Sequence, residues 1–130
     1  LLNHYSARNA NAAQFALRAR VLLLASPSGV GIDISLGALP FERLVVDRAT
    51  TFEFAPGVGL RTCSAEDLMV MKIFASRPID LRDAEGIAVR HDHRLDWGYI
   101  EEQLVPLAEA KESPQILREF ERVKRLGSTL

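Results

Sequence analysis

A lysine and a carboxylate interrupt otherwise apolar segments, and they are the first candidates for chemistry. Asp33 lies within the apolar residues 31–36, and Lys72 lies within the apolar residues 68–74. A charge inside an apolar element costs free energy unless it has a partner or a task. Phosphoryl transfer uses carboxylates that hold divalent metals and cations that contact phosphates. Asp33 is therefore a candidate metal ligand, and Lys72 is a candidate phosphate-binding cation.

Each of the two residues also has a purely structural interpretation. Asp33 can be a carboxylate of an edge strand that simply faces solvent. Lys72 can run along a buried helix and reach water with its ammonium group. A single carboxylate does not hold a metal tightly, so Asp33 would need further acidic companions on a neighbouring strand.

A third group of charges follows Lys72 in the sequence. Arg77, Asp80 and Asp83 form an Arg-Pro-x-Asp-x-x-Asp turn. Asp80 can cap the following helix, with Asp83 in its first turn, where carboxylates favour the helix dipole. The same residues can also brace Lys72 and face a substrate, and both interpretations can hold together.

The first half of the chain predicts short strands that would position Asp33. Residues 20–25 and the return strand 31–36 flank a Ser-Pro-Ser-Gly turn, which indicates an antiparallel hairpin. Because side chains alternate along a strand, Asp33 shares an open face with small residues, Gly31 and Ser35. The pattern then predicts a short helix from Pro40 and two further strands at residues 51–55 and 59–63.

The second half predicts four helices with apolar stripes. Ser64 caps the first, with Asp67 in a variant of the capping box, and Lys72 is its interior charge. Pro78 breaks that helix. The next three begin near Asp80, Asp96 and Ser113. Their inward positions are Leu81, Ala84, Ile87 and Ala88; Trp97, Ile100, Leu104 and Leu107; and Ile116, Leu117, Phe120 and Val123. We expect Trp97, Ile100 and Leu104 to pack against the Lys72 helix.

The predicted fold class is therefore α+β. A small mixed or antiparallel sheet precedes a helical C-terminal half. We expect one domain over residues 1–130, with a sheet-rich part at 1–63 and a helical part at 64–130.

Two other groups of residues have types that are used in catalysis or metal binding, but a purely structural interpretation is favoured for each. His91-Asp92-His93 has the composition of a metal motif, but histidines two residues apart rarely share a metal and no third ligand is evident. We expect these residues to form a loop. Cys63 lacks an obvious histidine or aspartate partner and is expected to pack in the core.

The composition of the chain limits the functional classes to which it can belong. The 130 residues are 48% hydrophobic and 25% charged, with a net charge of −1, so bulk charge gives no sign of nucleic-acid binding. A local basic patch remains open, because Arg77, Arg82, Arg90 and Arg94 are close in sequence. The single cysteine suits a reducing cytoplasm, and no apolar run is long enough to span a membrane. Because the chain does not begin with Met, we expect that it is not a complete translation product, which truncation, processing or an incomplete sequence would each explain.

Two segments carry a family resemblance when they are taken together. They are residues 29–36, Gly-Val-Gly-Ile-Asp-Ile-Ser-Leu, and residues 64–83, which run from Ser-Ala-Glu-Asp-Leu-Met-Val-Met-Lys to Arg-Pro-Ile-Asp-Leu-Arg-Asp. With residues 37–42 and 95–100, they resemble the minimal nucleotidyltransferases of the DNA polymerase β-like superfamily, in the AbiEii-like toxin branch. The resemblance covers residues 20–110.

This resemblance implies a nucleotidyltransferase fold and Mg²⁺-dependent transfer of a nucleoside monophosphate from an NTP to an RNA or protein acceptor. It implies Asp33 as the third metal carboxylate and Lys72 as a catalytic and phosphate-contacting residue, with Arg77, Asp80 and Asp83 bracing the site and facing the substrate. Some family members are toxins paired with an antitoxin protein.

The family also has a Gly-Gly or Gly-Ser strand and an Asp-x-Asp metal pair, and neither is in these residues. We therefore expect Mg²⁺ binding only where that segment is supplied. Two hypotheses remain: a nucleotidyltransferase seen in part, or a catalytically inactive module of the same fold that binds a protein partner or a nucleotide.

Overall fold

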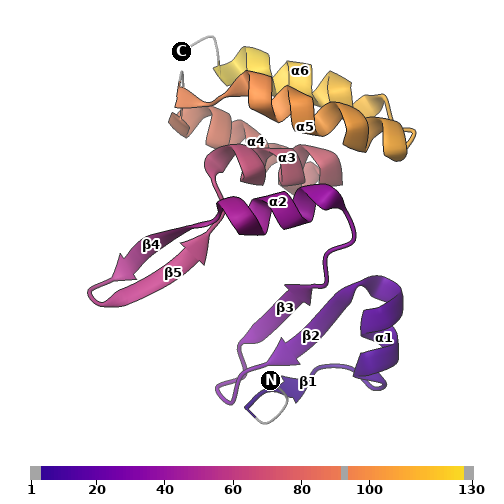
Figure 1. Cartoon of the computed structure of the whole chain (residues 1–130), viewed down its shortest axis with the longest axis vertical. Helices are drawn as coiled ribbons and strands as arrows, with labels where there is room; N and C mark the ends of the chain where they lie inside the picture. The colour runs from indigo at the N-terminus through magenta and orange to yellow at the C-terminus, as the bar shows by residue number, and fades with distance from the viewer. Residues whose placement is uncertain (1–3, 92–93, 128–130) are drawn as a thin grey trace. The chain divides into compact units, whose positions relative to one another are not determined.

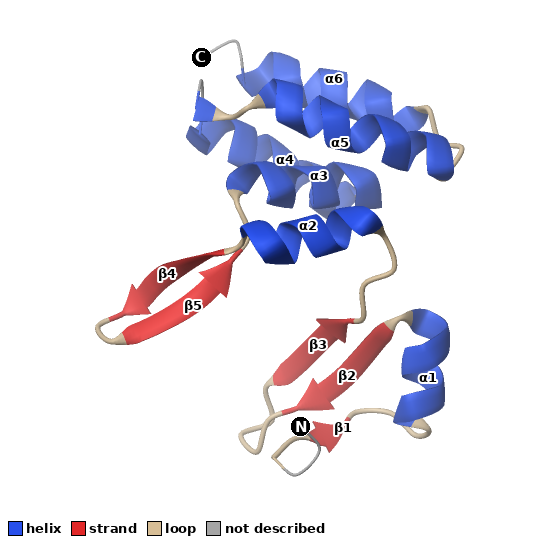
Figure 2. Cartoon of the chain, in the orientation of Figure 1, coloured by secondary structure: helices blue, strands red, loops and turns tan. Residues whose placement is uncertain are grey.

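Short strands dominate the first half of the chain and helices the second half. The structure, a computed structural model, describes residues 4–91 and 94–127. Six α-helices and two antiparallel sheets lie in these residues (Figures 1 and 2), so the α+β fold class is confirmed. The chain divides into two compact units, residues 1–43 and 44–130, and the boundary falls within helix α2. The expected single domain stays a prediction.

The first unit is a small sheet covered by a helix. Its elements are β1 (Ser6–Ala7), α1 (Ala12–Ala19), β2 (Val21–Ala25) and β3 (Gly31–Ser35), and the strand order is β1-β2-β3. The predicted hairpin of β2 and β3 is confirmed, with Leu23 opposite Asp33. Helix α1 packs on β2, where Leu24 is fully buried.

Helix α2 (Pro40–Arg48) begins at a proline, as the sequence predicts. A proline suits the first turn because the missing N–H would have no helical partner there. The carboxylate of Glu42 accepts hydrogen bonds from the N–H groups of Ala38 and Leu39. These bonds lower the pKa of Glu42 and fix the backbone where the chain turns into the helix.

The second unit opens with an isolated hairpin of β4 (Thr50–Ala55) and β5 (Val58–Thr62). The two strands that the sequence predicts after helix α2 are confirmed, and the turn between them contains Gly57, whose φ of 75° glycine adopts without strain. Phe52 lies opposite Leu60, and strand alternation places Val58 on the face of Leu60. The register shifts between Glu53 and Ala55, on either side of Phe54. The large apolar side chains of the hairpin are exposed: Phe52, Phe54, Val58 and Leu60.

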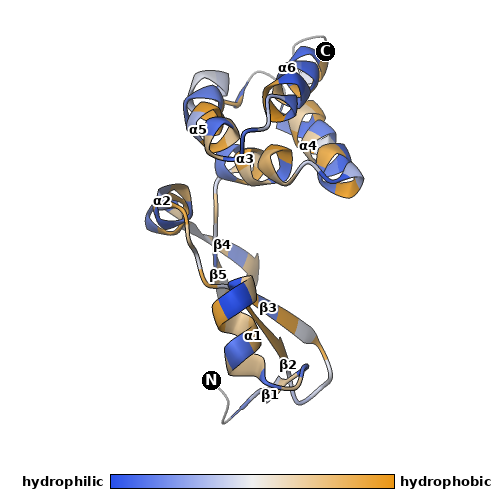
Figure 3. Cartoon of the chain, turned by 90° about the vertical axis from the view of Figure 1, so that its right-hand side faces the viewer, coloured by the Kyte–Doolittle hydropathy of each residue, from blue (hydrophilic) through white to orange (hydrophobic). Residues whose placement is uncertain are grey.

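Four helices form the rest of the second unit: α3 (Ala65–Ala75), α4 (Pro78–His91), α5 (Trp97–Ala110) and α6 (Gln115–Gly127). Helix α3 packs against both α4 and α5, which lie on opposite sides of it, and α6 contacts all three (Figure 3). The core residues include Met69, Val70, Ile73, Ala84, Ile87, Ala88, Ile100, Leu104, Leu107, Ile116, Phe120 and Val123. The predicted stripes therefore face the core, except that Leu81, Trp97 and Leu117 are only half-buried.

Two details of the sequence prediction need correction. Helix α4 begins at Pro78, so Asp80 lies inside its first turn and is not an N-cap. Trp97 lies against α6: its ring centroid is 6.2 Å from that of Phe120, and it borders Gly127. Ile100 and Leu104 are fully buried, in a helix that packs on α3.

The expected loop at His91-Asp92-His93 is described only at its first residue. His91 is the last residue of α4, whereas Asp92 and His93 lie outside the described residues. None of the described helices is long and apolar enough to cross a membrane.

Trp97 provides a test of this packing. Replacing Trp97 with Ala should lower the free energy of unfolding by about 3–5 kcal/mol, because the indole fills the space between α5 and α6. Urea unfolding followed by far-UV circular dichroism measures the loss. Trp97→Phe is the control, since it keeps an aromatic ring beside Phe120 and should cost much less. An alanine variant with wild-type stability would contradict the packing.

Candidate functional site

The charged residues around Lys72 come together where α3 gives way to α4. Helix α3 ends at Ala75, and its C-cap residue, Ser76, has a φ of 55° that turns the chain; Pro78 starts α4 two residues later. This tight connection places the last turn of α3 beside the first turn of α4. Lys72 Nζ lies 3.1 Å from Asp80 Oδ1 and 2.8 Å from Asp83 Oδ2.

Arg77 completes this cluster. Its Nε donates to the second carboxylate oxygen of Asp80, so Asp80 binds two cations at once. The structure therefore brings together four of the five residues that the sequence predicts as site residues: Lys72, Arg77, Asp80 and Asp83. We call these four residues the Lys72 cluster.

Burial differs sharply within the Lys72 cluster. The Asp80 side chain is 3% exposed, that of Lys72 27% and that of Arg77 71%. The hydrogen bond from Arg77, and next that from Lys72, hold the pKa of Asp80 below its ordinary value. The hydrogen bonds to Asp83 and Asp80 raise the pKa of Lys72. Lys72 is thus a fixed, permanently charged ammonium that still reaches solvent.

Asp33, the fifth predicted residue, belongs to the first unit. Its side chain is 65% exposed and forms an ion pair with Arg8, which follows β1. The backbone N–H of Arg8 bonds to Leu23, the residue opposite Asp33 in the sheet, so both side chains lie on the same face. The expectation that Asp33 and Lys72 face one cleft stays a prediction.

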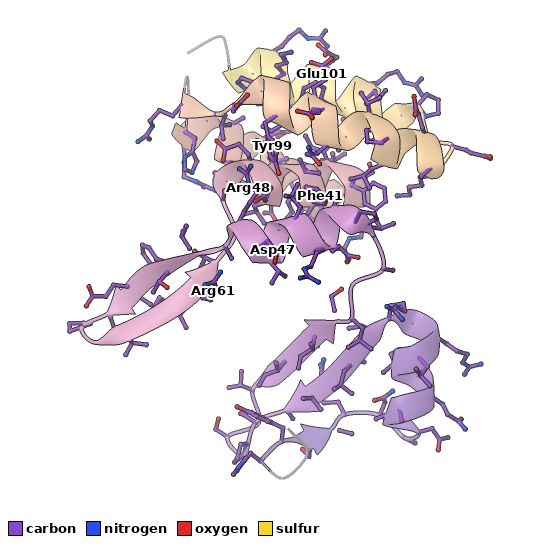
Figure 4. The ribbon with its side chains drawn as sticks, in the orientation of Figure 1. Phe41, Asp47, Arg48, Arg61, Tyr99 and Glu101 are labelled. Atoms are coloured by element: carbon purple, nitrogen blue, oxygen red, sulfur yellow. The ribbon has the colours of Figure 1, made fainter. Side chains whose placement is uncertain are left out.

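A second buried carboxylate is that of Asp67, whose side-chain role the sequence does not predict. The Asp67 side chain is fully buried in the first turn of α3. Its Oδ1 accepts a 2.6 Å hydrogen bond from the Tyr99 hydroxyl of α5, and its Oδ2 lies 3.5 Å from Arg48 Nε of α2. The Arg48 guanidinium in turn lies 4.1 Å from the centre of the Tyr99 ring (Figure 4).

The capping prediction was right for the backbone of Asp67 and incomplete for its side chain. The Ser64 hydroxyl accepts from the Asp67 N–H at 3.0 Å, as a capping box requires. The Asp67 carboxylate does not complete the box, because it turns to Tyr99. Asp96 caps α5 through the N–H of Tyr99 and so places that phenol in the first turn of the helix, but this cap does not by itself indicate Asp67 as the partner.

The described residues do not form a Mg²⁺ site by themselves. They contain no cluster of three or more His, Cys, Asp or Glu side chains that could hold a metal. Asp33 carries one carboxylate and binds Arg8 with it. Cys63 is half-buried, and burial, then the nearby Asp67 charge, raise the pKa of its thiol, which disfavours a reactive thiolate.

The sequence matches no family model, and it matches no curated protein either. The arrangement of the residues and the motif resemblance are therefore the two sources for a functional assignment.

The Lys72 cluster predicts a pH dependence of stability at acid pH. Because the pKa of Asp80 is lowered in the folded state, its contribution to stability is complete above the ordinary aspartate pKa of about 3.9. The contribution is lost as the pH falls below that value and through the folded-state pKa. Asp80→Asn should be less stable at neutral pH and show a flatter pH profile below about pH 4. Denaturant unfolding at a series of pH values measures this.

Asp83→Asn is the matched control for that experiment. Asp83 binds the same lysine, but its side chain is 47% exposed, so removing its charge should cost less. An equal loss in the two variants would show that burial of Asp80 is not what makes it important.

The environment of Tyr99 predicts a second pH dependence of stability, at alkaline pH. Burial, and next the hydrogen bond to Asp67, raise the pKa of Tyr99 to about 12 from an ordinary value of 10. The contribution of Tyr99 to stability is complete below pH 10 and is lost as the pH rises toward 12. In a Tyr5→Phe background, where Tyr99 is the remaining tyrosine, the tyrosinate absorbance should appear near pH 12.

Tyr99→Phe tests the same bond by stability. It should lower the free energy of unfolding by about 1–3 kcal/mol at neutral pH, because Asp67 Oδ1 is left buried without a donor. An ordinary phenol titration together with unchanged stability would rule out the bond.

Proposed function

We propose that this protein is a nucleotidyltransferase-fold protein of the AbiEii-like group. In this proposal it acts in the cytoplasm and transfers a nucleoside monophosphate from an NTP to an RNA or protein acceptor, where an Asp-x-Asp segment completes the site. Mg²⁺ belongs to the proposal only together with that segment, since the described residues do not form a metal site alone.

The observation that carries the proposal is the position of Lys72. Its ammonium is fixed by Asp80 and Asp83, and a quarter of its side chain remains exposed, 27%. An ammonium group has three N–H donors, and Lys72 uses two of them on Asp80 and Asp83. The third donor is held in a fixed position for a ligand oxygen, as a phosphate-binding group requires.

The ion pair of Asp33 with Arg8 is compatible with a role of Asp33 as a metal ligand. Both partners are exposed, 65% for Asp33 and 37% for Arg8. Exposed pairs contribute about 0–1 kcal/mol, so a ligand that needs the Asp33 carboxylate displaces Arg8 at little cost.

The alternative is a catalytically inactive module of the same fold that binds a protein partner, such as an antitoxin, or a nucleotide. One observation favours the protein partner: the exposed apolar side chains of the β4–β5 hairpin. Phe52 is 59% exposed and Phe54 70%, and a group of exposed large apolar side chains is more typical of an interface than of free surface.

The test uses a protein in which a Gly-Ser strand and an Asp-x-Asp pair accompany these 130 residues. It should transfer label from one of the four NTPs to RNA or protein, whereas the 130-residue chain itself should bind Mg²⁺–NTP weakly or not at all. Asp33→Asn should abolish transfer without unfolding the protein, because the amide keeps the shape and loses the charge. Lys72→Ala should weaken nucleotide binding or transfer.

Titration calorimetry and label transfer separate the outcomes. Full activity of Asp33→Asn would remove the metal-ligand role. Tight Mg²⁺–NTP binding by the 130-residue chain would remove the argument for an additional segment. Lys72→Arg is the control, because it keeps the positive charge that both Asp80 and Asp83 bind.

A further inference from the structure

Arg8 is a cation in a fixed position to which neither the proposed site nor the family resemblance, over residues 20–110, gives a role. It follows β1, and its backbone N–H donates to the carbonyl oxygen of Leu23 at 3.1 Å. Leu23 is opposite Asp33, on strand β2, which lies between β1 and β3 (Figure 1). The Arg8 side chain therefore reaches across β2 to bind Asp33, on the face that alternation places opposite the buried Leu24.

Gly31 provides the space in which the Arg8 guanidinium lies. It is two residues before Asp33 on β3, so the two positions share a face of the sheet. A Cβ at Gly31 would lie 3.2 Å from Arg8 Nη1, which is closer than ordinary van der Waals contact. A glycine inside a strand weakens the strand and often marks a site of close approach. Strand β3 thus has both a carboxylate that binds the guanidinium and a gap that the guanidinium fills.

The stability of the fold does not explain this arrangement. The ion pair is exposed, 37% for Arg8 and 65% for Asp33, and pairs of this kind contribute little to folding. A guanidinium has five N–H donors, and among the described residues Asp33 is the one group that accepts a hydrogen bond from the Arg8 side chain. The remaining donors are therefore available to an anion from solvent.

We propose that Arg8 is a further substrate-binding residue, which binds the triphosphate of the NTP. This inference rests on the proposed function, in which Asp33 lies beside the reacting phosphates. A carboxylate alone repels a triphosphate, and a guanidinium next to it offsets the repulsion. A guanidinium also donates two parallel hydrogen bonds to phosphate oxygens, which the ammonium of a lysine does not do.

Arg8 can bind the substrate even when Asp33 takes a ligand of its own. The weak ion pair then opens, but the backbone bond to Leu23 and the gap at Gly31 keep the guanidinium on the same face. Asp33 and a triphosphate therefore compete for Arg8. Removing the Asp33 charge should strengthen triphosphate binding, provided that Arg8 is present.

The experiment measures binding of inorganic tripolyphosphate to the 130-residue chain by titration calorimetry in EDTA, so that neither a metal nor transfer is involved. Asp33→Asn should bind several-fold more tightly than the wild type, and Arg8→Gln/Asp33→Asn should lose that gain. The matched control is Arg18→Gln/Asp33→Asn. It removes the same charge from an exposed arginine of α1 and should keep the gain.

Gly31→Ala tests the position of Arg8 without changing a charge. In the Asp33→Asn background it should weaken tripolyphosphate binding, because the new methyl group displaces the guanidinium, and a far-UV circular dichroism spectrum like that of the wild type shows that the chain is folded. A gain that persists without Arg8, no gain in Asp33→Asn, or full affinity after Gly31→Ala would overturn the proposal. An equal gain for oligouridylate would overturn it in favour of phosphodiesters. Because no transfer is measured, failure of this binding is distinguishable from failure of nucleotidyl transfer.

Discussion

The helical unit depends on the buried carboxylate of Asp67. A fully buried charge is tolerated only with partners, and Asp67 draws them from two other elements: Tyr99 from α5 and Arg48 from the end of α2. The position of Asp67 in the first turn of α3 adds the favourable end of the helix dipole. Since α3 also carries Lys72, the same helix is anchored at one end by a carboxylate and presents a cation near the other. A helix that could slide would not hold that cation in place.

Asp80, in the first turn of α4, stabilises the other end of α3 in the same way. Its side chain is 3% exposed and binds two cations, Lys72 and Arg77, which balance its charge. Lys111 strengthens this end, because its Nζ lies 2.9 Å from the Phe74 carbonyl oxygen and 4.7 Å from the centre of the Phe74 ring. Helix α3 is thus fixed to α4 and α5 by charges, in addition to the apolar packing of Met69, Val70 and Ile73. Polar networks of this kind specify one arrangement where apolar packing alone permits several.

The structural features that the sequence predicted correctly are local ones. The hairpin of β2 and β3, the Ser64 cap and the apolar stripes of α5 and α6 follow from turn chemistry and periodicity over a few residues. Asp67 was not assigned its buried role, because its partner Tyr99 is 32 residues away and nothing in the local pattern points to it. The N-cap assigned to Asp80 was wrong for a related reason. A capping motif and an ion pair with Lys72 use the same residue types, and only the packing of α3 against α4 decides between them.

Burial also separates two carboxylates that the sequence singled out. Asp80 and Asp33 each bind an arginine, but Asp80 is 3% exposed and Asp33 is 65% exposed. Water competes with Arg8 for the Asp33 carboxylate and hardly reaches that of Asp80, so the first pair is weak and the second is structural. A residue that must exchange partners during function has to be of the first kind. Asp33 meets that requirement and Asp80 does not, so within the proposed function Asp33 can bind a ligand and Asp80 is a positioning residue that acts through Lys72.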